Sequence, residues 1–419
     1  MKKVLILAYD FPPYNSIGGQ RPYSWFKYFK QFGLFPVVVT RHWDESITTP
    51  KDYIKPSIRQ DVSLEEYEEG VVYRVPFVPN VRDRFILKHG TDNGTIIRKI
   101  LSVWYMCVEF FVPFFDAKYS IYKKALSVCT NDDFSYIIAS GEPFILFKYA
   151  SKISQKTAVP WIADYRDGWS LNYNYSRFQR MFFLGIEKRL IRSCSCITTV
   201  SEEFQHQCAE FHSKPVYVIM NGFESIAGNL SHKAQSSGQF CMSFAGTMYP
   251  YQQIEMCSDA LRMCKKEVLD AIKIQWIGLN FYPEQKKKIC EVFSGIPVHH
   301  AFTDRIPQRD VISLLQKSSV LLLPASDTKN QVYAKIFDYL QVKRTIFLFP
   351  SDNGTLQEII DNTSSGYSFA NAKDLYTGLM DVFNEWKQNG FVECKTHSIE
   401  QYSRKNQAEK FVQILLNKN

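Results

Sequence analysis

The sequence lacks the short motifs that would assign it to several common enzyme classes. It contains no C-x-x-C pair, no P-loop, no G-x-S-x-G and no H-E-x-x-H. Its 10 cysteines follow no regular spacing, which predicts reduced, mostly buried thiols and no disulfide framework. It has no run of like charge long enough for a nucleic-acid-binding arm. These absences predict a cytoplasmic protein with neither a structural metal nor a nucleic-acid partner.

Long apolar runs are also missing. The apolar run at 4–8 has the length of a buried first strand. The most apolar segment, 96–115, is interrupted by Arg98, Lys99 and Glu109, so it falls short of the roughly 20 uncharged residues that a spanning helix needs. Two interpretations of this segment stay open. It forms a core helix, or it forms an apolar surface that faces a membrane or an acceptor.

The length of 419 residues and the 45% hydrophobic content predict two domains of about 200 residues each. Strand and helix patterns alternate through both halves, which predicts an α/β fold. We expect an N-terminal domain over 1–223, a linker over 224–239 and a second domain over 240–397. A C-terminal helix over 398–419 is expected to pack back on the first domain. The polar region 41–69 is expected to be irregular.

In the first half, the loop after the first strand contains Ser16, Gly18 and Gly19. Two glycines allow a ligand to approach the backbone, and the N-terminus of the helix that follows favours negative charge. A phosphate site and a plain turn are equally consistent with this pattern. The spacing differs from G-x-G-x-x-G, so it does not indicate a dinucleotide cofactor.

The segment 164–169, Asp-Tyr-Arg-Asp-Gly-Trp, follows a strand predicted to end at Ala163. Three ionisable groups within four residues are unusual for a loop that only connects two elements. We favour a catalytic or acceptor-binding position here. The alternative is a cluster of salt bridges that satisfies itself.

In the second half, Gly246 and Thr247 follow the first predicted strand, and a helix is predicted over 332–341. On that helix Lys335 and Asp338 share one face. A carboxylate suits ribose hydroxyls, and an ammonium suits a diphosphate. The alternative is an exposed ion pair within the helix, worth about 0.3–0.5 kcal/mol.

Taken together, these segments resemble the retaining glycosyltransferases of family 4. The resemblance covers nearly the whole chain and is closest to the bacterial branch that makes capsular and other cell-surface polysaccharides. It rests on 9–13 with Gly18 and Gly19, on 164–169, 198–202, 221–223, 244–247 and 335–340. It implies the GT-B fold, an α/β architecture of two Rossmann-like doubly wound domains that face each other across a cleft.

The resemblance also implies roles for individual residues. Donor binding is expected from Ser16, Gly18, Gly19, Gly246, Thr247, Arg305, Ile306, Asn330, Lys335 and Asp338. Catalysis is expected from Gly19, Asp167 and Lys335, and the acceptor side from Asp164, Arg166 and Trp169. Two departures stand out: Asn330 occupies the position of a family glutamate, and no cation follows Gly246. We expect Lys335 to replace that cation.

The expected reaction moves a hexose from a nucleotide-sugar, UDP in preference to GDP, to a polysaccharide or a lipid-linked saccharide. It retains the anomeric configuration and needs no metal or other cofactor. The expected location is the cytoplasm, with peripheral binding to the inner face of the cytoplasmic membrane. Two alternatives stay open: a nucleotide-sugar 2-epimerase or phosphorylase on the same fold, and a non-catalytic membrane-bound component of a synthesis complex.

Overall fold

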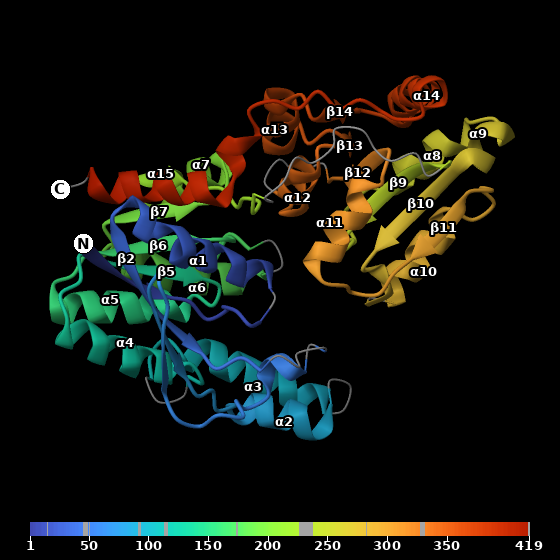
Figure 1. The fold of residues 1–419 in the computed structure, drawn as a ribbon. Coiled ribbons are helices and arrows are strands. Elements are labelled where there is room, and N and C mark those ends of the chain that lie inside the picture. The colour runs from blue at the N-terminus through green and yellow to red at the C-terminus, as the bar shows by residue number, and fades with distance from the viewer. Residues whose placement is uncertain are drawn as a thin grey trace. The chain divides into compact units, whose positions relative to one another are not determined.

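A computed structural model describes residues 1–14, 16–44, 49, 51–90, 94–112, 116–172, 175–225, 238–281, 283–326 and 332–417. The chain divides into two compact units (Figure 1). Unit 1 comprises Met1–Met220 and Arg404–Asn419, and unit 2 comprises Asn221–Ser403. The sequence placed the first boundary at 223 and the start of the returning segment at 398. Most of the predicted linker, 226–237, lies outside the described residues.

Unit 1 is built on a sheet of eight strands in the order β3-β4-β2-β1-β5-β6-β7-β8. The strands are β1 Lys2–Leu7, β2 Leu34–Arg41, β3 Ser63–Glu66, β4 Val71–Val75, β5 Tyr136–Gly141, β6 Trp161–Tyr165, β7 Cys196–Thr199 and β8 Val216–Val218. All pairs are parallel except β3 with β4. Continuous apolar runs form the central strands because helices cover both faces of the sheet.

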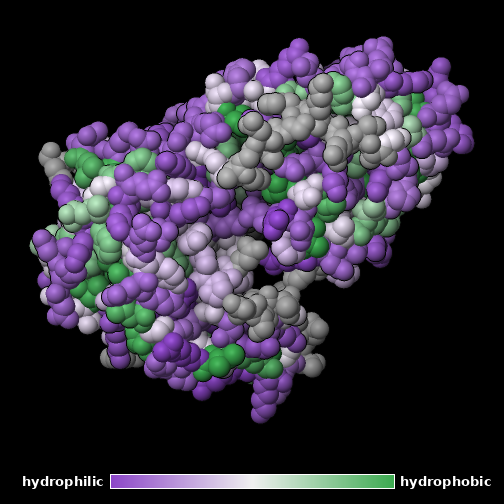
Figure 2. Space-filling view, viewed as in Figure 1, coloured by the Kyte–Doolittle hydropathy of each residue, from purple (hydrophilic) through white to green (hydrophobic). Residues whose placement is uncertain are grey.

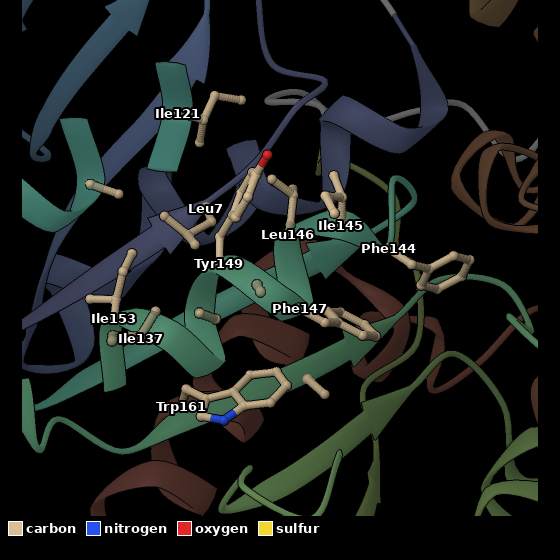
Figure 3. Packing of buried hydrophobic residues seen from close by; sticks show 14 of the residues in the cluster. Leu7, Ile121, Ile137, Phe144, Ile145, Leu146, Phe147, Tyr149, Ile153 and Trp161 are labelled. Carbon is tan, nitrogen blue, oxygen red and sulfur yellow. The ribbon is translucent and has the colours of Figure 1, made fainter. Parts of the chain in front are cut away.

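The helices of unit 1 form two layers. They are α1 Ile17–Tyr28, η1 Phe29–Phe32, η2 Asp52–Ile54, α2 Val81–His89, α3 Thr95–Val108, α4 Tyr119–Asn131, α5 Ile145–Thr157, α6 Arg177–Ile191, α7 Glu202–Phe211 and α15 Arg404–Leu416. On one face, Phe411 of α15 packs edge-on against Trp25 and Phe29 at ring distances of 5.2 and 5.7 Å. On the other, Phe147 and its α5 neighbours pack against Leu7 and Trp161 (Figure 3).

Unit 2 has a parallel sheet of six strands in the order β11-β10-β9-β12-β13-β14. These are β9 Phe240–Ala245, β10 Ile272–Ile277, β11 His299–Phe302, β12 Val320–Pro324, β13 Thr345–Phe349 and β14 Gly366–Ser368. Its helices are α8 Glu255–Arg262, α9 Lys266–Ala271, η4 Leu279–Phe281, α10 Pro283–Val292, α11 Gln308–Gln316, α12 Lys335–Val342, α13 Thr355–Thr363, α14 Ala372–Asn389 and η5 Ile399–Tyr402. Apolar residues of α8, α9, α10 and α14 cover one face of the sheet.

Both sheets share one connectivity. In chain order, the central six strands of unit 1 and all six of unit 2 run 3-2-1-4-5-6, the doubly wound order of Rossmann folds. The order reverses between β1 and β5 in unit 1, and between β9 and β12 in unit 2. In such sheets ligands bind beyond the carboxyl ends of the strands at this reversal. The loops after these four strands are therefore the places to examine.

The structure corrects three sequence expectations about local structure. Region 41–69 is not wholly irregular, because 63–66 forms the antiparallel edge strand β3. The tail from Ala372 to Leu416, whose pattern predicts helix throughout, breaks at Gly390, where a φ of 77° ends α14. The helix predicted from 332 begins at Lys335. The cysteine prediction is confirmed: all 10 thiols are free, and only Cys107 and Cys290 are not buried.

Candidate functional site

Asp164 forms a buried node at the carboxyl edge of the unit 1 sheet. Arg21 of α1 donates to it from Nη2 at 2.6 Å and from Nε at 3.1 Å. Ser140 at the end of β5 and Thr198 of β7 donate to the same carboxylate at 2.9 and 2.7 Å. The side chains of Arg21 and Asp164 are only 3% and 0% exposed. Asp164 therefore ties three strands to α1, and the expectation that it contacts an acceptor is corrected to a structural role.

Trp169, also expected on the acceptor side, belongs to the core. It is 2% exposed and stacks on Phe144 with ring centroids 5.0 Å apart and planes 3° from parallel. The ring centroid of Phe110 lies 5.1 Å from that of Trp169. The apolar surroundings explain why an aromatic residue stands in a loop that is otherwise charged. Trp169 fixes the loop rather than presenting a surface to a saccharide.

Arg166 fills the space beside the glycine loop. Its Nε donates to the Gly141 carbonyl at 2.9 Å, and its Nη2 donates to the Glu142 carbonyl. A Cβ at Gly18 would lie 1.7 Å from Arg166 Nη1. Gly18 is therefore needed for the approach of a guanidinium from the same unit, a reason that the sequence pattern did not indicate. Gly19 donates its backbone N–H to Ser16 Oγ at 2.9 Å, which caps α1.

Asp10 joins this cluster although the sequence did not single it out. Tyr53 and Ser16 donate hydrogen bonds to its two carboxylate oxygens at 3.2 and 3.3 Å. Burial raises the pKa of Asp10, and the charge of Arg166 opposes the rise. The sequence could have indicated Asp10, because it lies in the loop that follows the first strand β1. The sheet places β1 beside β5, so the loops after β1, β5 and β6 lie at the same edge.

Asp167 and Glu142 have residue surface open to solvent at this edge, while neighbouring loops partly desolvate their carboxyl groups. Burial by the surrounding loops raises the pKa of Asp167, and Arg166 offsets part of the rise. Burial also raises the pKa of Glu142, and the neighbouring charge of Asp167 raises it further. Asp167, predicted to be catalytic, is thus exposed, whereas Asp164 and Trp169, predicted on the acceptor side, are buried. Glu142 was missed, although its loop follows a central strand.

In unit 2, two open glycines stand next to each other at the carboxyl edge. Gly246 and Gly278 follow the paired ends of β9 and β10, and both have φ of 86°. Nothing lies within 4 Å of a Cβ built on either residue. The positive φ explains why glycine stands there, and the space beside each Cα is open. The Gly246 N–H donates to the Ile277 carbonyl at 2.9 Å, and the Gly278 N–H donates to Thr303 Oγ1 at 3.0 Å. The structure thus adds Gly278 to the predicted pair Gly246 and Thr247.

Lys335 points at the loop that contains this glycine. Its ammonium donates to the Thr247 carbonyl at 3.1 Å and lies 3.7 Å from the ring centre of Phe244. Burial lowers the pKa of Lys335 well below its usual range. Among the described residues it makes no ion pair with a carboxylate. The alternative of an exposed intrahelical ion pair is therefore wrong for Lys335.

Asp338 lies one turn further along α12. Gln308, the first residue of α11, donates to its Oδ1 at 3.1 Å. The loop before Gln308 contains Arg305 and Ile306, both expected to bind the donor, and this bond joins the end of that loop to the helix that carries Asp338. The exposed Arg305 and the partly buried Ile306 are accessible. Asn330 lies outside the described residues.

Within unit 2, the structure thus gathers Gly246, Thr247, Lys335 and Asp338 around the ends of β9 and β12. Within unit 1, it gathers Ser16, Gly18, Gly19, Arg166 and Asp167 around the ends of β1, β5 and β6. Each set lies at the strand-order reversal of its own sheet, where Rossmann folds bind ligands.

No protein-family pattern and no curated protein sequence matches the chain. Its fold is nevertheless shared with solved structures. A glycosyltransferase from Rickettsia africae matches with a TM-score of 0.62 and 11% identity over 99% of this chain and 98% of its own. HepE from Anabaena, bound to UDP and glucose, matches with a TM-score of 0.58 and 11% identity over 100% of both chains. The catalytic domain of starch synthase IV from Arabidopsis thaliana, bound to ADP and acarbose, matches with a TM-score of 0.60 and 11% identity over 100% of this chain and 99% of its own.

These full-length similarities confirm the fold expected from the sequence. The chain is an α/β protein with the two Rossmann-like domains of the GT-B glycosyltransferases. At 10–11% identity, the similarity concerns the fold. A shared fold does not fix the reaction, which depends on the residues at the site.

Proposed function

We propose that this protein is a glycosyltransferase that moves a sugar from a nucleotide-sugar, preferably a UDP-sugar. One observation carries the proposal. A lysine without a carboxylate partner among the described residues reaches the open Gly246 loop at the strand-order reversal of a Rossmann-like sheet. Burial alone favours the neutral amine of Lys335, and an anion beside it would favour the charged ammonium. The structures of similar fold include HepE bound to UDP-glucose.

The donor would bind to unit 2. The diphosphate would take the ammonium of Lys335 together with the backbone N–H of Thr247, because the Gly246 N–H already donates to the Ile277 carbonyl at 2.9 Å. These two donors would replace the cations that the resembling family has after this strand. Asp338, whose carboxylate is oriented by the hydrogen bond from Gln308, would accept hydrogen bonds from the ribose hydroxyls. The base would lie against Arg305 and Ile306, and Asn330 would contact the sugar. No metal or other cofactor is part of this proposal.

The acceptor would meet unit 1. Asp167 is the accessible carboxylate there and would orient the acceptor hydroxyl, while Gly18, Gly19 and Arg166 would face the departing diphosphate. In the proposed retaining step, the bond between the anomeric carbon and the phosphate oxygen breaks. The acceptor oxygen bonds the same face of that carbon, and its proton passes to the phosphate. Lys335 would stabilise the charge that develops on the leaving group. The facing of the two units across a cleft stays a prediction.

The first test is a thermal-shift screen of UDP, GDP, ADP and their hexose conjugates. A donor that binds the folded state raises the melting temperature by mass action. We expect UDP to stabilise the wild type and to have no effect on Asp338→Ala. Asp361→Ala, an exposed carboxylate on α13, serves as the matched control and should respond like the wild type.

Product analysis then separates the reactions that this fold supports. With a stabilising donor and saccharide acceptors, we expect mass spectrometry to detect a product heavier by one hexose together with free nucleotide diphosphate. Conversion of the donor in the absence of any acceptor would instead identify an epimerase. If no nucleotide diphosphate stabilises the protein, the proposed donor site is wrong.

A further inference from the structure

Helix α3 exposes an apolar face that the core of unit 1 does not use. Ile96, Ile97 and Ile100 are 75%, 52% and 63% exposed, and Val103 and Trp104 are 55% and 40% exposed. Figure 2 shows hydrophobic residues gathered where Figure 1 places this helix. The opposite face of α3 is anchored, since the buried Tyr105 accepts a hydrogen bond from the backbone of Val81 at 3.1 Å. The helix is therefore held with its apolar side outward.

The N-terminal half of α6 extends this face. Phe178 and Met181 are 68% and 67% exposed. Two contacts join α6 to the α3 segment: Gln179 Nε2 reaches Met106 Sδ at 3.8 Å, and the Phe182 ring lies 6.4 Å from the 60%-exposed Phe111. Large exposed apolar patches on a folded protein indicate a binding surface. We call the outward residues of these two helices the α3–α6 face.

The charge of this face has one sign. Helix α3 contains Arg98 and Lys99 and no acidic residue. On α6, the exposed charged residues are Arg177, Arg180, Lys188 and Arg189. The only acid of α6, Glu187, is buried and accepts hydrogen bonds from Tyr165 and Ser170. The two helices thus expose both apolar and cationic side chains, and their own residues supply no exposed carboxylate.

We propose that the α3–α6 face binds the surface of a bilayer that contains anionic lipids. Isoleucine, phenylalanine and tryptophan side chains would enter the boundary between headgroups and acyl chains, while the arginines and lysines would contact the phosphates. A second copy of the chain is a poorer occupant because two such faces would bring cations against cations. Combined with the proposed function, on which this last clause rests, the face would hold unit 1 at the membrane that carries a lipid-linked acceptor.

The test is vesicle flotation with the full-length protein and no nucleotide. Vesicles of phosphatidylcholine alone are compared with vesicles that also contain phosphatidylglycerol. We expect partitioning only into the anionic vesicles, with a loss on addition of salt. Each removed cation should weaken partitioning about fivefold, so Arg98→Gln, Lys99→Gln and Arg177→Gln together should weaken it roughly a hundredfold. Ile100→Ser with Met181→Ser should also abolish it.

Controls make the result decisive. Met263→Ser removes an apolar residue of unit 2 that is 48% exposed, and it should float like the wild type. The proposal is overturned if the wild type ignores anionic vesicles, or if the Ile100→Ser, Met181→Ser variant floats unchanged. It is also overturned if light scattering shows a wild-type dimer that this variant converts to a monomer. Donor-induced thermal shifts should persist in all variants, so failure here is distinguishable from failure of the donor site.

Discussion

The charged side chains at the carboxyl edges of the two sheets differ in whether the protein itself supplies their partners. In unit 1, the buried charge of Asp164 is met by Arg21, and Arg166 is held by the carbonyls of Gly141 and Glu142. In unit 2, the buried amino group of Lys335 meets only a carbonyl and a ring face among the described residues, and its burial disfavours the charged form. The first arrangement satisfies itself, whereas the second is complete only with an anion.

This difference shows how a charged loop and a charged site can be told apart. A buried ion pair with all its hydrogen bonds made holds strands together and leaves nothing for a ligand. A buried lysine that has no carboxylate partner among the described residues and lies beside an open glycine loop can instead bind an anionic ligand. This contrast supports the proposal that the donor binds to unit 2 and that the exposed Asp167 and Glu142 of unit 1 meet the acceptor.

The largest expected effect is a loss of stability when the buried hydrogen-bonded cluster around Asp164 is disrupted. Asp164→Asn should lower the free energy of unfolding by about 3–5 kcal/mol, because it leaves the Arg21 guanidinium buried without its counter-charge. For a unit of this size, that corresponds to a fall of roughly 6–20 °C in the melting temperature measured by calorimetry. Asp61→Asn, which removes an exposed carboxylate paired with Arg59, is the control and should leave the melting temperature unchanged. Equal melting temperatures for the two variants would show that the node is dispensable.

The next effect concerns unit 2. Lys335→Met keeps the apolar contact with Phe244 and removes the ammonium. The affinity for UDP measured by calorimetric titration should fall about 10- to 150-fold, which corresponds to about 1.5–3 kcal/mol for one charge-assisted hydrogen bond. Stability without ligand should not fall, since a desolvated charge is removed. The exposed Lys317→Met serves as the control, and an unchanged affinity in Lys335→Met would refute the assignment.

The smallest effect is a pH dependence confined to unit 1. Burial raises the pKa of Glu109 to about 7 from the ordinary 4.5. Between these values the folded chain keeps a proton that the unfolded chain has lost, so stability should fall as the pH rises from about 4.5 to about 7. Glu109→Gln should reduce this slope in melting-temperature measurements across that window. The same slope in wild type and variant would place the titrating group elsewhere.

Much of the fold could be predicted because short sequence patterns indicate the individual strands and helices. Continuous apolar runs such as Val4–Ala8 marked the central parallel strands, and the segment around Lys335 and Asp338 marked the helix beside the donor loop. Short elements were missed where the pattern is weak: β3 is polar, and β14 has only three residues.

The site was predictable by position but less so by role. Both Asp164 and Asp167 follow the same strand, yet one is buried by Arg21 and the other reaches solvent, which depends on residues far away in the sequence. Trp169 was expected on the acceptor side, but the structure stacks it against Phe144 in the core. Gly18 matched a phosphate loop, but the contact that requires it comes from Arg166. Long-range packing decided each of these cases.

Hydrogen exchange of the full-length protein with and without UDP tests the central claim most directly. The account predicts slower exchange in unit 2 at 245–249, 278–280, 303–308 and 335–339, which are the loop after β9, the loop after β10, the approach to α11 and the start of α12. Lys335→Met should lose this protection at equal UDP concentration. Protection confined to the glycine loop of unit 1, with the unit 2 segments unchanged, would contradict the account.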